Sequence, residues 1–143
     1  MKFFNNLPAK QQELIVDSEK NMTNIMNENT VKYKSYAFAL RIIKAYKFLS
    51  SEQREFVLSK QMLRSGTAVG ALIREAEHAE SKADFIHKMS IALKEANETE
   101  YWLMLLHDSD FFDSKSFSSI VIDCKELIKM LVSIIKSSKT NSK

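Results

Sequence analysis

Apolar residues recur every three or four positions over most of the chain after residue 30, which is the spacing of one buried face on an α-helix. The pattern divides into four segments, near residues 31–49, 50–80, 81–108 and 114–136, with short polar stretches between them. Short connections place consecutive helices antiparallel to one another. We therefore expect an all-α fold, an antiparallel up-down-up-down four-helix bundle.

Capping signals indicate where the expected helices begin. Ser50, with Gln53 three residues later, fits a capping box and would start the second helix. Ser81, followed by Asp84, would cap the third helix in the same way. The fourth helix would begin near Ser114, after a polar turn.

The expected domain organisation is a bundle over residues 31–136 with an extension at each end. Residues 1–30 are polar and rich in asparagine, so we expect a poorly ordered N-terminal extension, in which residues 9–19 are a candidate short helix. Met26 is an alternative start for the compact domain. Residues 137–143 form a basic C-terminal tail that should fray.

The only two glycines, Gly66 and Gly70, lie four residues apart inside the second helical segment. Each glycine costs a helix about 1 kcal/mol relative to alanine, and residues four apart share one helix face. We interpret both as helix-packing residues that let another backbone approach closely. The alternative is a break at Gly66, with Thr67 capping a new helix.

Cysteine content and hydropathy point to a cytoplasmic protein with no membrane partner. The single cysteine, Cys124, excludes an intramolecular disulfide, and the first residues lack the apolar run of a signal peptide. The longest apolar run, residues 101–106, is far shorter than the roughly 20 residues that a membrane span needs. A reducing compartment is the expected location.

Charge is unevenly distributed, although the formal net charge is only +3. The first expected helix carries only basic residues, whereas residues 81–108 carry three basic and five acidic residues. A run of cations favours phosphates, so these residues are candidate nucleic-acid-binding residues: Lys32, Lys34, Arg41, Lys44 and Lys47. A solvated helix face, or pairing with the acidic third helix through Glu95, Glu98 and Glu100, would explain the same charges.

Apolar residues exceed what the core of four helices needs. The first expected helix has two apolar stripes, and residues 101–106 are apolar on every side. A surplus of this kind is typical of a surface that another chain covers. We expect a homo-oligomer whose interface contains Tyr36, Leu40, Tyr101, Trp102 and Leu105.

Two pairs of residues have the acid-x-x-His spacing of carboxylate-bridged metal sites in bundles, Glu75 with His78 and Asp84 with His87. Both pairs flank the turn between the second and third helices. A di-metal core also needs an inward acid from each remaining helix, and the first helix has none. We therefore expect solvated helix ends here and no metal.

No catalytic arrangement is recognisable by spacing. Cys124 falls on the apolar stripe of the fourth helix, where a thiol usually acts as a small buried hydrophobe. The segment at Gly66 lacks the glycine spacing and the following Lys-Ser/Thr of a phosphate loop. We expect a protein that is not an enzyme, with no catalytic residues and no cofactor.

Three segments resemble a known family: SYAFALRI at 35–42, LSKQMLRSGTAVGA at 58–71 and KADFIHKMSIALKEANETEYWL at 82–103. They are similar to the four-helix-bundle proteins first noticed in intervening sequences of bacterial 23S ribosomal RNA genes. The resemblance covers about residues 31–135 and includes polar residues that a bundle alone does not require.

The resemblance implies an up-down bundle that assembles as a ring, typically a homopentamer. It also implies kinship with the accessory proteins of diversity-generating retroelements, which bind nucleic acid and a reverse transcriptase. The implied partners are further copies of the chain, RNA or DNA, and a reverse transcriptase or another protein. A protein-interaction scaffold without nucleic-acid binding is the alternative function, because kinship does not fix activity.

Overall fold

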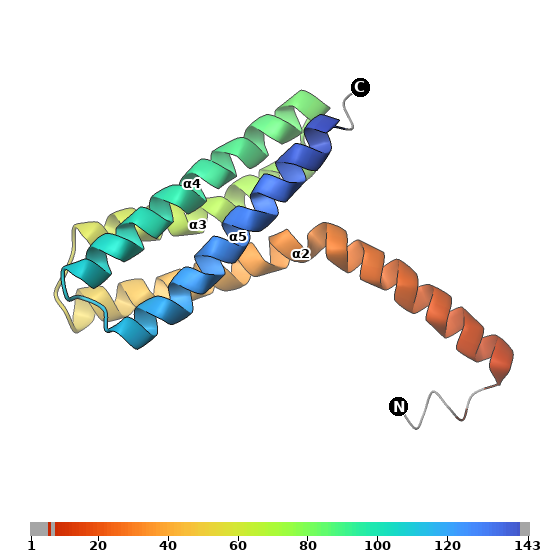
Figure 1. Ribbon diagram of the computed structural model, residues 1–143, viewed down its shortest axis with the longest axis horizontal. Coiled ribbons are helices and arrows are strands. Elements are labelled where there is room, and N and C mark those ends of the chain that lie inside the picture. The colour runs from red at the N-terminus through yellow and green to blue at the C-terminus, as the bar shows by residue number, and fades with distance from the viewer. Residues whose placement is uncertain (1–5, 7, 141–143) are drawn as a thin grey trace. The chain divides into compact units, whose positions relative to one another are not determined.

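The computed structural model describes residue 6 and residues 8–140, and for residues 14–29 it describes the backbone alone. Four helices account for most of this part: α2 (Ala9–Ser51), α3 (Leu58–Glu77), α4 (Lys82–Asp108) and α5 (Ser114–Thr140). The chain divides into two compact units, Met1–Thr30 and Val31–Lys143. The second unit contains the bundle, to which α2 contributes its residues from Val31 onward (Figure 1).

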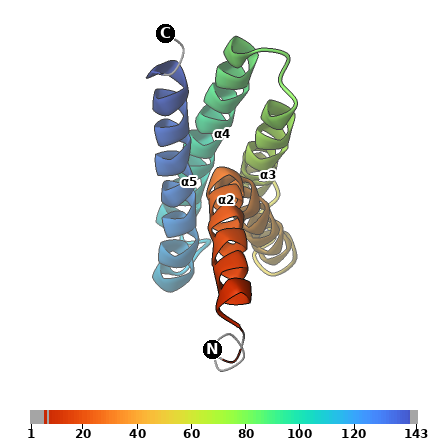
Figure 2. The ribbon, with the colours of Figure 1, turned by 90° about the vertical axis from the view of Figure 1, so that its right-hand side faces the viewer.

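Contacts between the helices show that neighbours run antiparallel. Ser35 of α2 lies beside Gly70 of α3, and Ile42, further along α2, lies beside Gly66, which is earlier in α3. Figure 2 shows α4 between α3 and α5. Because α2 contacts both α3 and α5, it lies diagonally opposite α4. The predicted antiparallel up-down-up-down four-helix bundle is confirmed.

The first helix begins earlier than the sequence pattern indicated. α2 is continuous from Ala9 to Ser51, so the short helix expected over residues 9–19 is part of a much longer one. Pro8 opens the helix, since its carbonyl accepts the backbone N–H groups of Gln11 and Gln12 at 2.9 Å. No proline or glycine follows before residue 66, so no residue forces an interruption.

The expected start of the second helix at Ser50 is wrong. Ser50 lies inside the last turn of α2 and donates its hydroxyl to the Tyr46 carbonyl at 2.8 Å. A loop follows in which Arg54 has a φ of 54°. Glu55 caps α3 instead, because its carboxylate accepts the backbone N–H groups of Val57, Leu58 and Ser59 at 2.7–3.0 Å.

The two later connections follow the sequence more closely. Ser81 caps α4 as predicted and accepts the backbone N–H of Asp84 at 3.0 Å. The predicted start of the last helix near Ser114 is also confirmed, with Asp113 accepting the backbone N–H of Ser116 at 2.7 Å. The helix α5 then continues to Thr140, beyond the boundary expected at residue 136.

The helix α3 is continuous through both glycines, and the alternative of a break at Gly66 is wrong. A Cβ atom at Gly66 would lie 2.8 Å from Ile42 Cγ1, a separation that real Cβ atoms almost never show. At Gly70 the nearest atom would be Ser35 Oγ at 3.4 Å. The missing side chains therefore let α2 and α3 approach closely.

The core contains the apolar stripes that the periodicity indicated. Its largest fully buried side chains are Phe38, Ile42, Leu49, Met62, Val69, Met89, Leu103, Leu106, Cys124, Leu127 and Leu131, with Thr99. The buried Thr99 hydroxyl is satisfied, since it donates to the Glu95 carbonyl at 2.7 Å and lies 2.8 Å from Ser65 Oγ. Buried hydroxyls on α3 and α4 thus bond to each other or to the backbone.

Candidate functional site

Three of the five candidate nucleic-acid-binding cations form ion pairs with other helices of the same chain. Lys32 pairs with Glu77 of α3 at 3.0 Å, and Lys34 pairs with Glu126 of α5. Arg41 is held most firmly. Its guanidinium pairs with Asp123 and also donates to the carbonyl and hydroxyl oxygens of Ser119. These three side chains link α2 to α3 and α5 through ion pairs.

The other two cations, Lys44 and Lys47, are exposed, and no ion pair involves either of them within residues 8–140. They lie in the last two turns of α2, beyond Arg41. The five predicted residues thus divide into a paired group and an unpaired one, and the unpaired ammonium groups are available to an anionic partner.

The alternative of pairing between the first bundle helix and the acidic helix is not seen within the described part of the chain. Glu95 and Glu98 of α4 pair instead with Arg64 of α3, Glu95 at 3.1 Å. The acids that neutralise α2 come from α3 and α5. This follows from the diagonal placement of α2 and α4, which separates them by the width of the bundle.

The predicted interface residues lie on two separate faces. Tyr36 and Leu40 are exposed on α2, and Tyr101 is exposed on α4, with 56% and 55% of the two tyrosines accessible. Leu105 and Trp102 are partly buried, and Trp102 packs against the core. The ring of Tyr101 contacts that of Trp102 edge-to-face, with centroids 5.1 Å apart.

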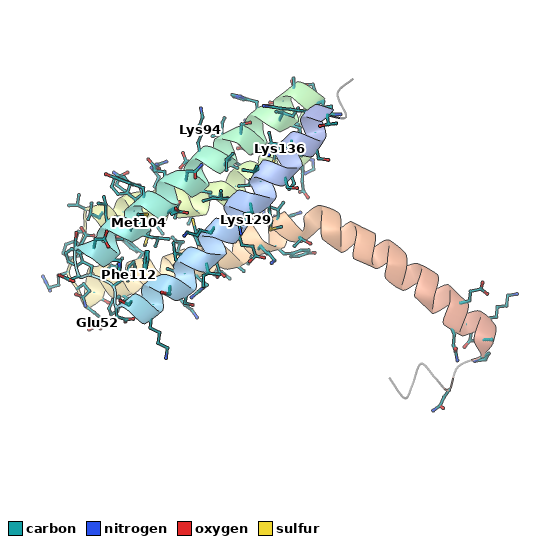
Figure 3. All side chains as sticks on the ribbon, in the orientation of Figure 1. Glu52, Lys94, Met104, Phe112, Lys129 and Lys136 are labelled. Carbon is teal, nitrogen blue, oxygen red and sulfur yellow. The ribbon has the colours of Figure 1, made fainter. Side chains whose placement is uncertain are left out.

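Two further exposed side chains extend these faces and were not among the predicted residues. Tyr33 lies three residues before Tyr36, and Met104 lies three residues after Tyr101. Helical spacing from the predicted residues could have found both of them. We call Tyr33, Tyr36 and Leu40 the α2 stripe, and Tyr101 and Met104 the α4 stripe; Figure 3 labels Met104 on α4.

A groove of about 560 Å³ lies between the C-terminal part of α2 and the start of α5. It is at the end of the bundle where Figure 3 labels Phe112 and Glu52. Its lining residues are Arg41, Lys44, Ala45, Phe48, Phe112, Asp113, Lys115, Ser116, Ser119 and Ile120. Sequence reasoning identified Arg41 and Lys44 but missed Lys115, which is distant in the sequence.

Two residues of the acid and histidine pairs considered for a metal lie at helix ends. Asp84 belongs to the α4 cap, where it accepts the backbone N–H of Glu80, and His78 is the exposed C-cap of α3. The described residues contain no group of three or more His, Cys, Asp or Glu side chains that could hold a metal ion.

Cys124 is buried and donates its thiol to the Ala96 carbonyl at 3.3 Å. Burial, and to a smaller extent the charges of Glu100 and Asp123, raises the pKa of this thiol to about 12. The thiol therefore stays protonated near neutral pH, which opposes nucleophilic reactivity.

Two comparisons with known proteins give a match for this chain. The family model of the 23S rRNA-intervening sequence protein matches residues 27–133. A crystal structure of a protein of unknown function from the S23 ribosomal protein family of Bacteroides thetaiotaomicron VPI-5482 is 59% identical, with a TM-score of 0.76. The match covers 78% of this chain and 99% of that one. The comparison with curated proteins gives no match. Among the described helices, none is long and apolar enough to cross a membrane.

Proposed function

Because the chain belongs to the family of 23S rRNA-intervening sequence proteins, we propose that it is a cytoplasmic homo-oligomer that binds RNA or DNA and has no catalytic role. The observation that carries this proposal is the pair of exposed apolar stripes on diagonally opposite helices, α2 and α4. The cations Lys44 and Lys47 continue along α2 beyond its stripe.

Two different apolar surfaces on opposite sides of a subunit favour a head-to-tail assembly. If the α2 stripe of one copy packs on the α4 stripe of the next, each subunit uses both surfaces once. Contacts of this heterologous kind close into a ring when the rotation between subunits permits. Family resemblance favours five subunits.

Light scattering at micromolar concentration tests the assembly. We expect a mass that is a multiple of the subunit mass, close to five subunits. Tyr36→Glu and Tyr101→Glu, one on each stripe, should both shift the protein toward the monomer, since each places a charge in an apolar contact. Ile122→Glu is the matched control, because Ile122 is 62% exposed but lies on α5, outside both stripes. A monomeric wild-type protein would contradict the proposal.

Nucleic-acid binding would depend chiefly on the unpaired cations. A single subunit offers Lys44 and Lys47 as exposed, unpaired ammonium groups on α2, which is few for stable binding. A ring repeats them in every subunit and lets weak phosphate contacts add through multivalency. Binding of this kind is insensitive to sequence and weakens steeply with salt, because each phosphate contact releases counterions.

Fluorescence anisotropy with a labelled RNA of mixed sequence tests the binding. Affinity should fall by at least tenfold between about 50 and 200 mM salt. The double variant Lys44→Glu, Lys47→Glu should lose most of the binding and flatten this salt dependence. Lys136→Glu, on the exposed surface near the end of α5, is the control. Absence of binding at low salt, with protein well above micromolar concentration, would reject nucleic-acid binding.

A protein-interaction scaffold is the second candidate function. The ion pairs of Lys32, Lys34 and Arg41 favour it, because these cations serve contacts within the chain. In that case the oligomer would form as described, and neither RNA nor DNA would bind. The two measurements above therefore separate the candidates.

A further inference from the structure

The groove between α2 and α5 combines an open aromatic side chain with a mostly apolar floor. Ala45, Phe112 and Ile120 provide apolar surface, and Phe48 lies at the same groove with 42% of its surface exposed. A volume of about 560 Å³ is within the range of clefts that hold small organic ligands. An exposed aromatic ring at such a groove can stack against a planar group such as a nucleic-acid base.

The charges around the groove favour an anion next to that planar group. Lys44 of α2 and Lys115 of α5 both line it, both are exposed, and the described residues provide no ion pair for either. Arg41 also lines the groove, but Asp123 and Ser119 already bind its guanidinium. The two ammonium groups come from different helices and line the same groove, so both are available to the phosphates of one bound strand.

The acid that lines the groove is already engaged. Asp113 accepts the backbone N–H and the hydroxyl of Ser116, and these bonds lower the pKa of its carboxyl group. Its carboxylate also occupies the N-terminus of α5, so backbone amides there do not form the anion site. Phosphate binding would depend on the lysine side chains.

We infer that this groove binds a short single-stranded stretch of RNA or DNA, with a base stacked on Phe48 and phosphates at Lys44 and Lys115. The inference rests on the proposed function, because it specifies where and in which form nucleic acid is held. A duplex keeps its bases stacked on one another and cannot present one to Phe48. Single strands are therefore the expected ligand, whatever their sequence.

Fluorescence anisotropy with a labelled eight-nucleotide oligouridylate, compared with a duplex of equal length, tests this inference. We expect the single strand to bind the wild-type protein more tightly than the duplex. Phe48→Ala should weaken single-strand binding by about tenfold, the effect typical of losing one stacked base, and leave duplex binding unchanged. Lys115→Glu should weaken binding of the single strand by a similar factor.

Two matched variants control for general effects on the surface. Phe56→Ala removes an aromatic ring that is 47% exposed but does not line the groove. Lys129→Glu reverses an exposed charge on α5 about 21 Å along the helix from Lys115, at 1.5 Å per residue. Both should bind the single strand as the wild type does. Circular dichroism confirms that each variant keeps its helical content.

The outcomes separate failure of the groove from failure of the proposed function. No binding of either oligonucleotide by the wild type would overturn both. Binding that Phe48→Ala and Phe56→Ala weaken equally, or that prefers the duplex, would overturn the groove and leave nucleic-acid binding in place. A polyglutamate peptide of equal charge that competes as well as the oligonucleotide would also overturn the inference, since it has no base to stack.

Discussion

The two faces of α2 differ in what they accomplish. The inner face packs Phe38 and Ile42 into the core and meets the side of α3 that carries Gly66 and Gly70. The outer face carries Tyr33, Tyr36 and Leu40, which are large and mostly apolar side chains but remain exposed.

The contrast shows that apolar periodicity marks surfaces which need a partner, without saying whether the partner is in the same chain. On the inner face the partner is α3, and the fit leaves no room for one additional carbon atom at Gly66. On the outer face no partner is present within the described chain. The first face should therefore control folding, and the second should control assembly.

Truncating one aromatic residue on each face should give the largest difference in the free energy of unfolding. Phe38→Ala should lower the free energy of unfolding by about 3–5 kcal/mol, because it removes a buried ring and leaves a cavity. Tyr36→Ala should lower it by less than about 1 kcal/mol, measured under conditions where both proteins are monomeric. Urea denaturation followed by circular dichroism gives both values. Equal losses would show that the two faces are energetically alike.

Much of the fold followed from the sequence, because helical spacing and local capping depend on neighbouring residues. The stripes on α4 and α5 and the cap at Ser81 are of this kind. The cap at Ser50 was wrong because the match to Ser50 and Gln53 did not take account of Glu55, whose carboxylate reaches three backbone N–H groups once Arg54 has a positive φ. Which of the two candidate caps forms depends on the backbone conformation of the loop. The hydrophobic periodicity of the helices gives no information about that conformation.

Less of the candidate site followed from the sequence, because its contacts join distant residues. Periodicity placed Lys34 and Lys44 on the same helix. It did not show that Glu126 would pair with Lys34 and not with Lys44. Lys115 lines the groove with Lys44 only because α2 and α5 are adjacent and antiparallel. The rotation of each helix about its axis determines these contacts. An apolar stripe shows which side of a helix faces the core, but it does not define the rotation closely enough to predict which surface side chains meet.

Replacing each glycine of α3 by alanine tests how closely α2 and α3 pack on the inner face. Gly66→Ala should lower the free energy of unfolding by about 1–3 kcal/mol, since the new Cβ overlaps Ile42. Gly70→Ala adds a Cβ at ordinary contact distance from Ser35, so the gain in helix propensity of up to about 1 kcal/mol should offset any shift. Thermal unfolding compares the two. A greater loss at Gly70 would contradict the closer fit of α2 at Gly66.

The cap of α3 should make part of the stability depend on pH. Burial alone would raise the pKa of Glu55, but the N–H donors of Leu58, Ser59 and Val57 outweigh it and lower the pKa from 4.5. A depressed pKa stabilises the folded state above the unfolded value, and this contribution is lost as pH falls through the folded pKa. Glu55→Gln should therefore cost about 1 kcal/mol at pH 7 and progressively less below pH 4.5.

Urea denaturation of both proteins between pH 3 and pH 7 measures this dependence. Glu52→Gln is a suitable control, because Glu52 is an exposed carboxylate of the same loop and caps no helix among the described residues. Its difference from the wild type should stay small and nearly constant over this range. A constant difference for Glu55→Gln as well would show that the carboxylate charge contributes nothing to the cap.

The exposed ion pairs between α2 and its neighbours should have the smallest effect. Lys34 and Glu126 are both partly exposed, so solvent screens their attraction and ordering two long side chains costs entropy. We expect a coupling free energy below about 1 kcal/mol from a double-mutant cycle of Lys34→Ala and Glu126→Ala, and less in 1 M salt. Lys44→Ala with Glu126→Ala should show no coupling, since these side chains do not pair. A coupling of several kcal/mol would mean that polar contacts, rather than the glycine-lined apolar contact, hold α2 in the bundle.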